Sequence, residues 1–166
     1  MHVAAKISMV GRQQGGKAII ENNQKYENRI VMDKYTISPI GTIKTPYRLK
    51  KKAPCQAANS CGAEATIEIF GKYMQGLEGL EGYEYIIILF YFDRICGHSL
   101  TARPPGAKRP RGVFATRSPN RPNHIGMTVS RLLGVEGNKI KVRDIDLLDG
   151  TPIIDIKPYI RDLDKR

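Results

Sequence analysis

The sequence lacks the usual signals of a membrane or exported protein. Its 166 residues contain no run of eighteen apolar residues, and the apolar stretch 86–92 is far too short to span a bilayer. The first residues contain neither an uninterrupted apolar region nor the small-residue cleavage site of a leader peptide. We therefore expect a soluble, cytoplasmic protein.

Cysteine and histidine are scarce, with three of each in the chain. An odd number of cysteines without a leader fits free thiols in a reducing cytosol. Cys55, Cys61, Cys96 and His98 offer metal ligands in principle, but no CxxC or CxC pair supports a zinc site. We expect no metal.

The templates of several enzyme classes are also absent. The motifs GxSxG, HExxH and the P-loop do not occur, so the sequence gives no support for the hydrolase and kinase mechanisms that use them. The glycines at 76, 79 and 82 do not form the GxGxxG of a dinucleotide-binding fold, and Glu78 and Glu81 between them would repel phosphates. No internal repeat is evident.

What the sequence does contain is a cationic segment, Arg94–Arg131, which has eight Lys or Arg and no Asp or Glu. The chain carries a net charge of +11, and most of it lies in this segment. Local charge density of this kind predicts a polyanionic partner, because phosphate binding depends on it. The alternative is a surface that is charged only for solubility.

Five of the ten prolines fall in the same segment. Proline fixes φ and removes a hydrogen-bond donor, so the segment is not expected to form a regular helix or a central strand. The apolar patch 113–115 indicates that the segment is anchored rather than disordered. We predict a stiff cationic loop that carries a site.

The remaining pattern predicts an all-β fold, a small antiparallel β-barrel, in a single domain over 35–166. Residues 1–34 are polar and predict a flexible extension, with a basic RNA-binding arm as the alternative. We expect a short helical turn over Gly71–Tyr83 and a bulge near Arg143-Asp144. The expected strands are Tyr35–Thr45 (a kinked edge strand), Ala65–Phe70, Tyr85–Phe92 (a continuous apolar strand), the hairpin Thr128–Val135 with Lys139–Val142, and Ile153–Ile156.

Four segments, in the same order, closely resemble the TrmO (YaeB-like) family of S-adenosyl-L-methionine-dependent tRNA N6-methyltransferases. They are ISPIGTIKTPY (Ile37–Tyr47), GLEGLEGY (Gly76–Tyr83), RGVFATRSPNRPNHIG (Arg111–Gly126) and LDGTPIIDIKPY (Leu148–Tyr159). The resemblance covers about residues 35–160 and implies a small β-barrel that acts as a homodimer. It also implies methyl transfer to N6 of threonylcarbamoyladenosine at position 37, beside the anticodon of threonine tRNAs. Because bacterial members carry a further C-terminal domain, a chain ending at Arg166 is expected to be the short, barrel-only form.

The resemblance also implies a set of cofactor-binding positions for S-adenosyl-L-methionine. At three positions this chain departs from the family: Cys55 replaces an arginine, Asp93 replaces a histidine, and His124 stands where proline is usual. Side-chain roles for Cys55 and Asp93 therefore do not carry over directly, whereas backbone contacts can. The matching positions are Pro54, Cys55, Gln56, Asp93, Arg94, Arg117, Pro119, Asn120, Val129, Asp149, Gly150, Thr151 and Pro152.

The chemistry of these residues leads to specific hypotheses. Arg117 is expected to hold the methionine carboxylate, and Asp149 to bond a ribose hydroxyl or the adenine amine. Asp149 is also the candidate base or positioning group, because the target nitrogen is conjugated to a carbamoyl group and its proton is comparatively acidic. The residues expected to contact phosphates of the tRNA anticodon stem-loop are Lys108, Arg109, Arg111 and Arg121.

Several alternatives stay open at this point. Asp149 precedes a glycine and fits a simple turn former equally well, and His124 fits a loop residue better than a base. The whole chain also fits a non-catalytic, basic RNA-binding β-barrel, or a methyltransferase with another substrate.

Overall fold

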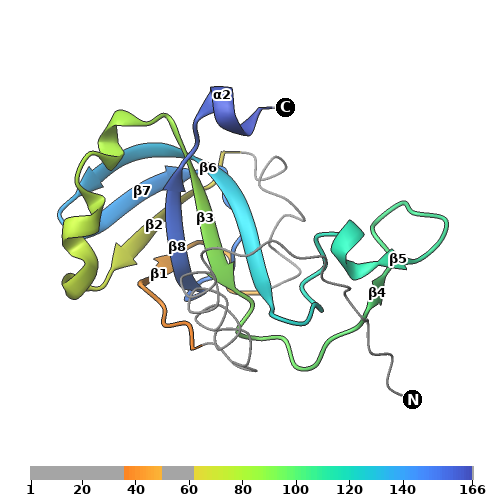
Figure 1. Cartoon of the computed structure of the whole chain (residues 1–166). Coiled ribbons are helices and arrows are strands. Elements are labelled where there is room, and N and C mark those ends of the chain that lie inside the picture. The colour runs from red at the N-terminus through yellow and green to blue at the C-terminus, as the bar shows by residue number, and fades with distance from the viewer. Residues whose placement is uncertain (1–35, 50–61, 166) are drawn as a thin grey trace, which may run out of the picture. The chain divides into compact units, whose positions relative to one another are not determined.

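Six antiparallel strands close into a barrel, which confirms the predicted fold class. The computed structural model describes residues 36–49 and 62–165. Around the barrel the strands follow the order β1-β2-β7-β6-β3-β8, and β8 pairs with β1 to complete the ring (Figure 1). The strands are β1 (Gly41–Lys44), β2 (Glu64–Ile69), β3 (Tyr85–Tyr91), β6 (Ile125–Glu136), β7 (Lys139–Arg143) and β8 (Pro152–Pro158).

Short elements fill the connections between these strands, and one more, α2, follows the last strand. The segment between β2 and β3 forms two 3-10 helices, as the glycine-rich sequence predicted, and a two-stranded sheet lies between β3 and β6. The barrel and this sheet belong to one compact unit, Ile37–Arg166. The short elements are η3 (Gly71–Leu77), η4 (Leu80–Gly82), β4 (Thr101–Ala102), β5 (Arg111–Gly112), η5 (Val113–Ala115) and α2 (Arg161–Asp164).

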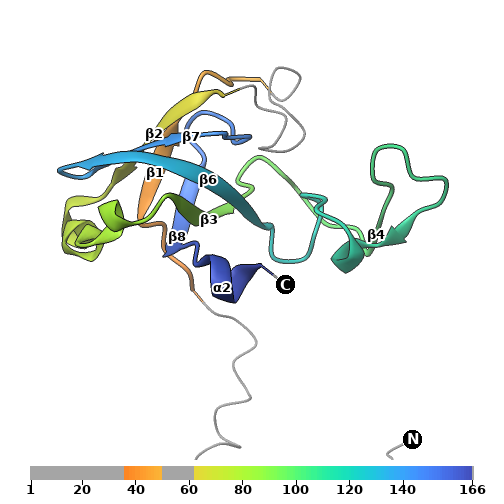
Figure 2. The same cartoon turned by 90° about the horizontal axis from the view of Figure 1, so that it is seen from above.

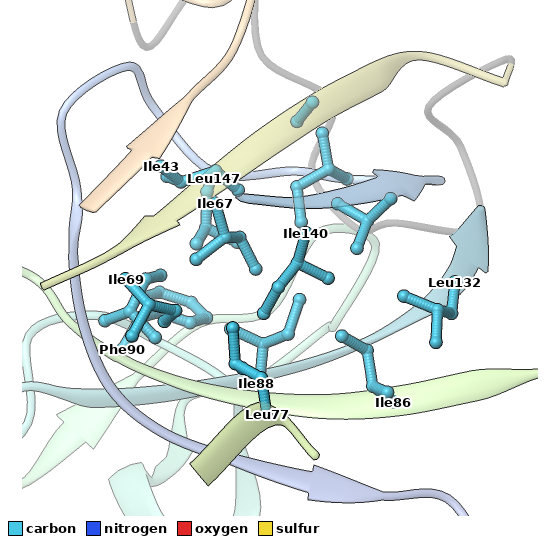
Figure 3. Close-up of a cluster of buried hydrophobic side chains, with 14 residues drawn as sticks. Ile43, Ile67, Ile69, Leu77, Ile86, Ile88, Phe90, Leu132, Ile140 and Leu147 are labelled. Atoms are coloured by element: carbon cyan, nitrogen blue, oxygen red, sulfur yellow. The ribbon is translucent and has the colours of Figure 1, made fainter. Parts of the chain in front are cut away.

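Alternation of side chains along the strands builds the barrel core. In β2, Ala65, Ile67 and Ile69 are buried, while Thr66 and Glu68 between them are half-buried on the outer face. Figure 3 shows isoleucines of β2, β3 and β7 pointing toward one another inside the barrel. The apolar run of β3 follows the same rule, since Ile86, Ile88 and Phe90 are buried whereas its outward residues are half-buried or exposed. Strand β3 therefore supplies a core face and an apolar outer face.

The β6–β7 hairpin turns at Gly137-Asn138, as predicted, with Glu136 paired to Lys139. Gly137 has φ 59°, a conformation that favours glycine. The predicted bulge lies elsewhere, however. The register of the β6–β7 pairing shifts between Leu132 and Gly134 on β6, and β7 ends at Arg143. At the predicted position the chain leaves the strand instead, since Asp144, the residue after β7, has φ 65°.

Two further strand predictions need correction. Strand β1 is not an edge, because it pairs with both β2 and β8, and barrel closure removes edges. Strand β6 begins at Ile125, so residues 125–131 of the cationic segment form a central strand. This is possible because the last proline of that segment is Pro122. The predicted extension 1–34 lies outside the described residues.

Within the described ranges, no helix has the length and apolar character needed to cross a membrane.

Candidate functional site

The cationic segment leaves the barrel after β3 and returns at the start of β6, and its two ends are fastened together. Phe92 N–H donates to the carbonyl of His124 at 2.9 Å. The His124 ring spans the same junction, since Nε2 donates to the carbonyl of Gly97 at 2.7 Å and Nδ1 faces the Tyr91 hydroxyl at 3.5 Å. Because a carbonyl only accepts, Nε2 must be the donor in this hydrogen bond. His124 thus closes the loop base, and the interpretation of it as a loop residue fits this geometry.

The middle of the loop is organised around the carbonyl oxygen of Val113. It accepts hydrogen bonds from Thr116 N–H at 3.0 Å, Thr116 Oγ1 at 2.8 Å and Arg121 Nη2 at 3.2 Å. Val113 N–H donates to Leu100 O at 2.9 Å, and the Val113 side chain is 1% exposed. The loop is therefore internally braced, which is what its prolines and apolar patch predicted.

The turn before β8 is built on β1. Asp149 Oδ1 accepts the N–H of Thr45 at 3.0 Å, and Asp149 N–H donates to Tyr47 O at 2.9 Å. Gly150 continues the pairing by donating to Ile43 O at 2.8 Å, and its φ of 80° suits glycine. Asp149 is thus a turn former, and its half-buried carboxylate still has Oδ2, which accepts no hydrogen bond from the residues that the structure describes.

Arg94 joins the beginning of the cationic loop to this turn. Its guanidinium donates to the main-chain oxygen of Asp149, and it lies 3.9 Å from the carboxylate of Asp93. A side chain added at Gly150 would reach within 3.7 Å of Arg94 Nη2. The structure therefore gathers four of the predicted cofactor-binding residues, Asp93, Arg94, Asp149 and Gly150, in one place.

The other predicted cofactor residues are distributed differently. Arg117 is exposed and, within the described ranges, makes no hydrogen bond or ion pair. Asn120 is used by its backbone, whose carbonyl accepts Ser99 N–H at 3.2 Å. No hydrogen bond or ion pair in the described part of the chain links the loop positions Arg117, Pro119 and Asn120 to the Asp149 turn.

Of the remaining cofactor positions, Thr151 is buried and its hydroxyl donates to Leu148 O at 2.8 Å. Pro152 begins β8, and Val129 lies 36% exposed on β6. Pro54, Cys55 and Gln56 lie outside the described residues.

The four predicted phosphate contacts fall into two kinds. Lys108, Arg109 and Arg111 are exposed on β5 or on the connection from β4 to it. Arg121 is half-buried, and its Nη2 donates to Thr116 O at 3.2 Å as well as to Val113 O. Its guanidinium therefore stabilises the loop, a role that no sequence motif predicted.

The apolar patch 113–115 also divides in a way that the sequence did not show. Val113 is buried, as an anchor should be, but Phe114 is 80% exposed. Adjacent residues of a single 3-10 turn point in different directions, so only one of the two can face the loop interior.

The outer surface of the barrel differs strongly between its two sides. Three ion pairs join neighbouring strands on one side: Lys44–Glu68 at 3.0 Å between β1 and β2, Arg143–Glu64 at 2.6 Å between β7 and β2, and Lys141–Glu136 at 2.8 Å between β7 and the end of β6. On β3 and β6 two outward pairs are apolar, Leu89 with Met127 and Ile87 with Val129. At the end of the same ladder, Arg131 lies 3.8 Å from the carboxylate of Glu84. Met127 is 49% exposed.

Among the described residues, no group of three or more His, Cys, Asp or Glu side chains could hold a metal ion. Cys96 is exposed and free.

These observations define a class: a small closed β-barrel with a braced cationic loop whose start is fastened to a polar turn. The model of the tRNA-methyltransferase O N-terminal domain family matches residues 42–165. The chain belongs to this family, as its motifs predicted.

Named relatives and solved structures agree with this assignment. An S-adenosyl-L-methionine-binding protein of Archaeoglobus fulgidus is 44% identical, over 77% of this chain and 91% of its own length. A tRNA (adenine(37)-N6)-methyltransferase of Mus musculus is 40% identical over 76% of this chain but only 31% of its own length. The crystal structure of TrmO from Pseudomonas aeruginosa superposes with a TM-score of 0.69 at 38% identity, covering 80% of this chain and 59% of that one. The chain thus spans about three fifths of the solved TrmO chain.

Proposed function

We propose that this chain is an S-adenosyl-L-methionine-dependent tRNA methyltransferase that acts on N6 of adenine 37, with threonylcarbamoyladenosine of threonine tRNAs as its substrate. The observation that carries the proposal is the family match over residues 42–165, which includes both the cationic loop and the Asp149 turn. The names of the relatives support the cofactor and the adenine position. Because the proposed substrate is tRNA, we also propose that the protein acts in the cytoplasm.

Two of the predicted cofactor residues carry groups whose chemistry suits the cofactor. Arg117 has an exposed guanidinium available for the methionine carboxylate, and Asp149 Oδ2 is available for a ribose hydroxyl or the adenine amine. The bound cofactor supplies an electrophilic methyl group on a sulfonium. In such a transfer the S–CH₃ bond would be broken, the N6–CH₃ bond made and the N6 proton lost, so the residues of this chain would mainly have to align the reactants.

Asp149 is the candidate acceptor or orienting group for that proton. Its carboxylate is held at Oδ1 by Thr45 N–H, so the direction of Oδ2 is fixed by the turn. Arg94 holds the same turn through the main chain. A fixed, half-buried carboxylate suits a group that orients N6 or receives its proton.

The exposed cations of the loop provide the contact to tRNA. Changing Lys108, Arg109 and Arg111 to Ala should weaken tRNA binding and flatten the slope of log K against log salt, because fewer counterions are released. Arg121→Ala should weaken binding as well, partly by loosening the loop that it braces. The matched control is Lys141→Ala, since Lys141 is paired with Glu136 on the barrel. A salt slope that stays unchanged in the triple variant would remove the loop from the tRNA interface.

The apolar outer face of β3 and β6 supports the proposal of a homodimer. Apolar pairs on an outer face, such as half-buried Leu89 with exposed Met127, are typical of surfaces covered in an assembly, whereas the ion-paired side of the barrel suits water. Met127→Glu should convert a dimer to a monomer, measured by light scattering after size exclusion. A monomeric unmodified protein would refute the homodimer.

The decisive experiment is calorimetric titration with S-adenosyl-L-methionine, followed by transfer of labelled methyl to tRNA. Saturable binding that is weakened by Arg117→Ala and by Asp149→Ala, together with methylation of tRNA bearing threonylcarbamoyladenosine but not plain adenine at position 37, is the expected result. Methylation of tRNA with plain adenine alone at position 37 would show that the proposed substrate is wrong. No cofactor binding, even with tRNA present, would favour a non-catalytic RNA-binding barrel.

A further inference from the structure

Phe114 carries the most exposed large apolar side chain in the part of the chain that the structure describes, at 80%. Its neighbour Val113 is 1% exposed. A phenyl ring this exposed lacks the hydrophobic stabilisation that burial would give it. The ring is therefore not part of the packing that holds the loop together.

The backbone under Phe114 is nevertheless held in place. Phe114 is the middle residue of η5, and the residue before it donates to Leu100 O at 2.9 Å. The carbonyl of Val113 accepts two hydrogen bonds from Thr116 and one from Arg121, which close the turn around Phe114. The η5 turn that carries Phe114 follows β5 directly and lies next to the β4–β5 sheet (Figure 2).

The charges around this ring are all of one sign along the chain. Arg111 and Arg117, both exposed, lie three residues on either side of Phe114, and the segment 94–131 holds no acidic residue. An aromatic ring set among cations is the combination with which proteins bind unpaired nucleotides, stacking on the base while the cations neutralise its phosphates. A purely apolar partner would leave these guanidinium groups unpaired.

We propose that Phe114 is a stacking platform for one unpaired base of the tRNA anticodon loop, with Arg111 on an adjacent phosphate. This inference rests on the proposed function and identifies a residue that would bind the tRNA substrate. Stacking on Phe114 keeps an anticodon-loop base out of its own stack, which helps to expose the neighbouring adenine edge for methyl transfer.

The test compares Phe114→Leu, Phe114→Trp and Arg111→Ala in binding an anticodon stem-loop RNA at several salt concentrations. Phe114→Leu should weaken binding by about five- to 100-fold without changing the salt slope, because stacking releases no counterions. Phe114→Trp should bind at least as well as the unmodified protein. Arg111→Ala should reduce the salt slope by about one. Leu100→Ala, at a 65% exposed apolar residue of the same loop, is the matched control and should bind normally.

A second readout reports stacking directly. 2-Aminopurine placed at successive positions of the RNA loop should be quenched at one position by the unmodified protein and by Phe114→Trp, but not by Phe114→Leu. Melting temperature and cofactor affinity should be the same in all variants, since Phe114 is outside the core.

The possible failures separate the two proposals. If the unmodified protein binds the RNA and Phe114→Leu binds it equally well, the stacking platform is wrong while the tRNA interface stands. If the unmodified protein does not bind tRNA at all, both proposals fall. If Phe114→Leu changes the oligomeric state of the protein, measured as its molar mass in solution, the ring is a contact between copies of the chain, and the inference is overturned.

Discussion

The guanidinium of Arg94 donates a hydrogen bond to the main-chain oxygen of Asp149, 55 residues later in the chain. Arg94 is the first residue of the cationic segment, and Asp149 opens the turn into β8. The contact fixes the loop entrance relative to the one carboxylate proposed to meet the target adenine. The two parts of the candidate site are thus coupled through a single side chain.

Arg94→Ala should weaken cofactor binding about three- to tenfold, the usual worth of one hydrogen bond in a polar site. The physical reason is that the Asp149 turn loses its tie to the loop. Titration calorimetry measures the change. Arg103→Ala is the matched control, because Arg103 bonds Lys108 O at 2.9 Å within the hairpin and is the same residue type in the same segment. Equal losses in the two variants would mean that only the charge of the segment matters.

Asp149→Asn and Asp149→Ala should separate the structural role of this residue from its chemical one. Asparagine keeps an Oδ1 acceptor for Thr45 N–H, so the melting temperature should stay close to that of the unmodified protein. Alanine leaves that donor unpaired and should cost about 1 kcal/mol of unfolding free energy. If Asp149 receives the N6 proton, Asp149→Asn should lower kcat while cofactor affinity changes little. Full activity in Asp149→Asn would exclude Asp149 as the base.

Gly126→Ala should destabilise the barrel by about 1–3 kcal/mol or more, the usual cost of overpacking. A Cβ at this position would collide with the Phe90 ring and come within 2.9 Å of Phe92. Gly134→Ala is the control on the same strand, since nothing lies within 4 Å of the added Cβ there. Thermal unfolding of both variants tests the difference. Similar melting temperatures would show that the two phenylalanines can move aside.

The stability of the protein should fall in acid, in part through the ion pairs on the outside of β2 and β7. Lys44 lowers the pKa of Glu68, and Lys141 lowers the pKa of Glu136, chiefly by hydrogen bonding. A lowered folded-state pKa stabilises the protein above the unfolded pKa, and this contribution is lost as the pH falls below about 4.5. Glu68→Gln with Glu136→Gln should therefore flatten the decline of melting temperature in acid, and added salt should do the same. A decline that is unaltered in the double variant would assign it to other carboxylates.

Local pattern was sufficient for much of the fold. The alternation in Ala65–Phe70 and the turn at Gly137-Asn138 depend on neighbours in the chain, and both appear as predicted. Residues 85–91 are apolar throughout, so the pattern located the strand without showing which face is buried. That was decided when β3 paired with β6 and β8 and closed the ring.

The candidate site shows the same division. The sequence motifs identified the family and the charged residues of the candidate site, because these depend only on the type and order of residues. Their partners were not predictable, because Thr45 and Asp149 are 104 residues apart and no local rule joins them.

The sequence by itself therefore determined a β-rich chain with a braced cationic loop and the composition of its site. Only the tertiary structure decided that Arg121 and His124 hold the loop together, that Val113 is buried and that Phe114 is presented to the surroundings. The physical reason is that burial and hydrogen-bond pairing are properties of the closed barrel and the folded loop, in which residues distant in sequence compete for the same carbonyls and the same interior.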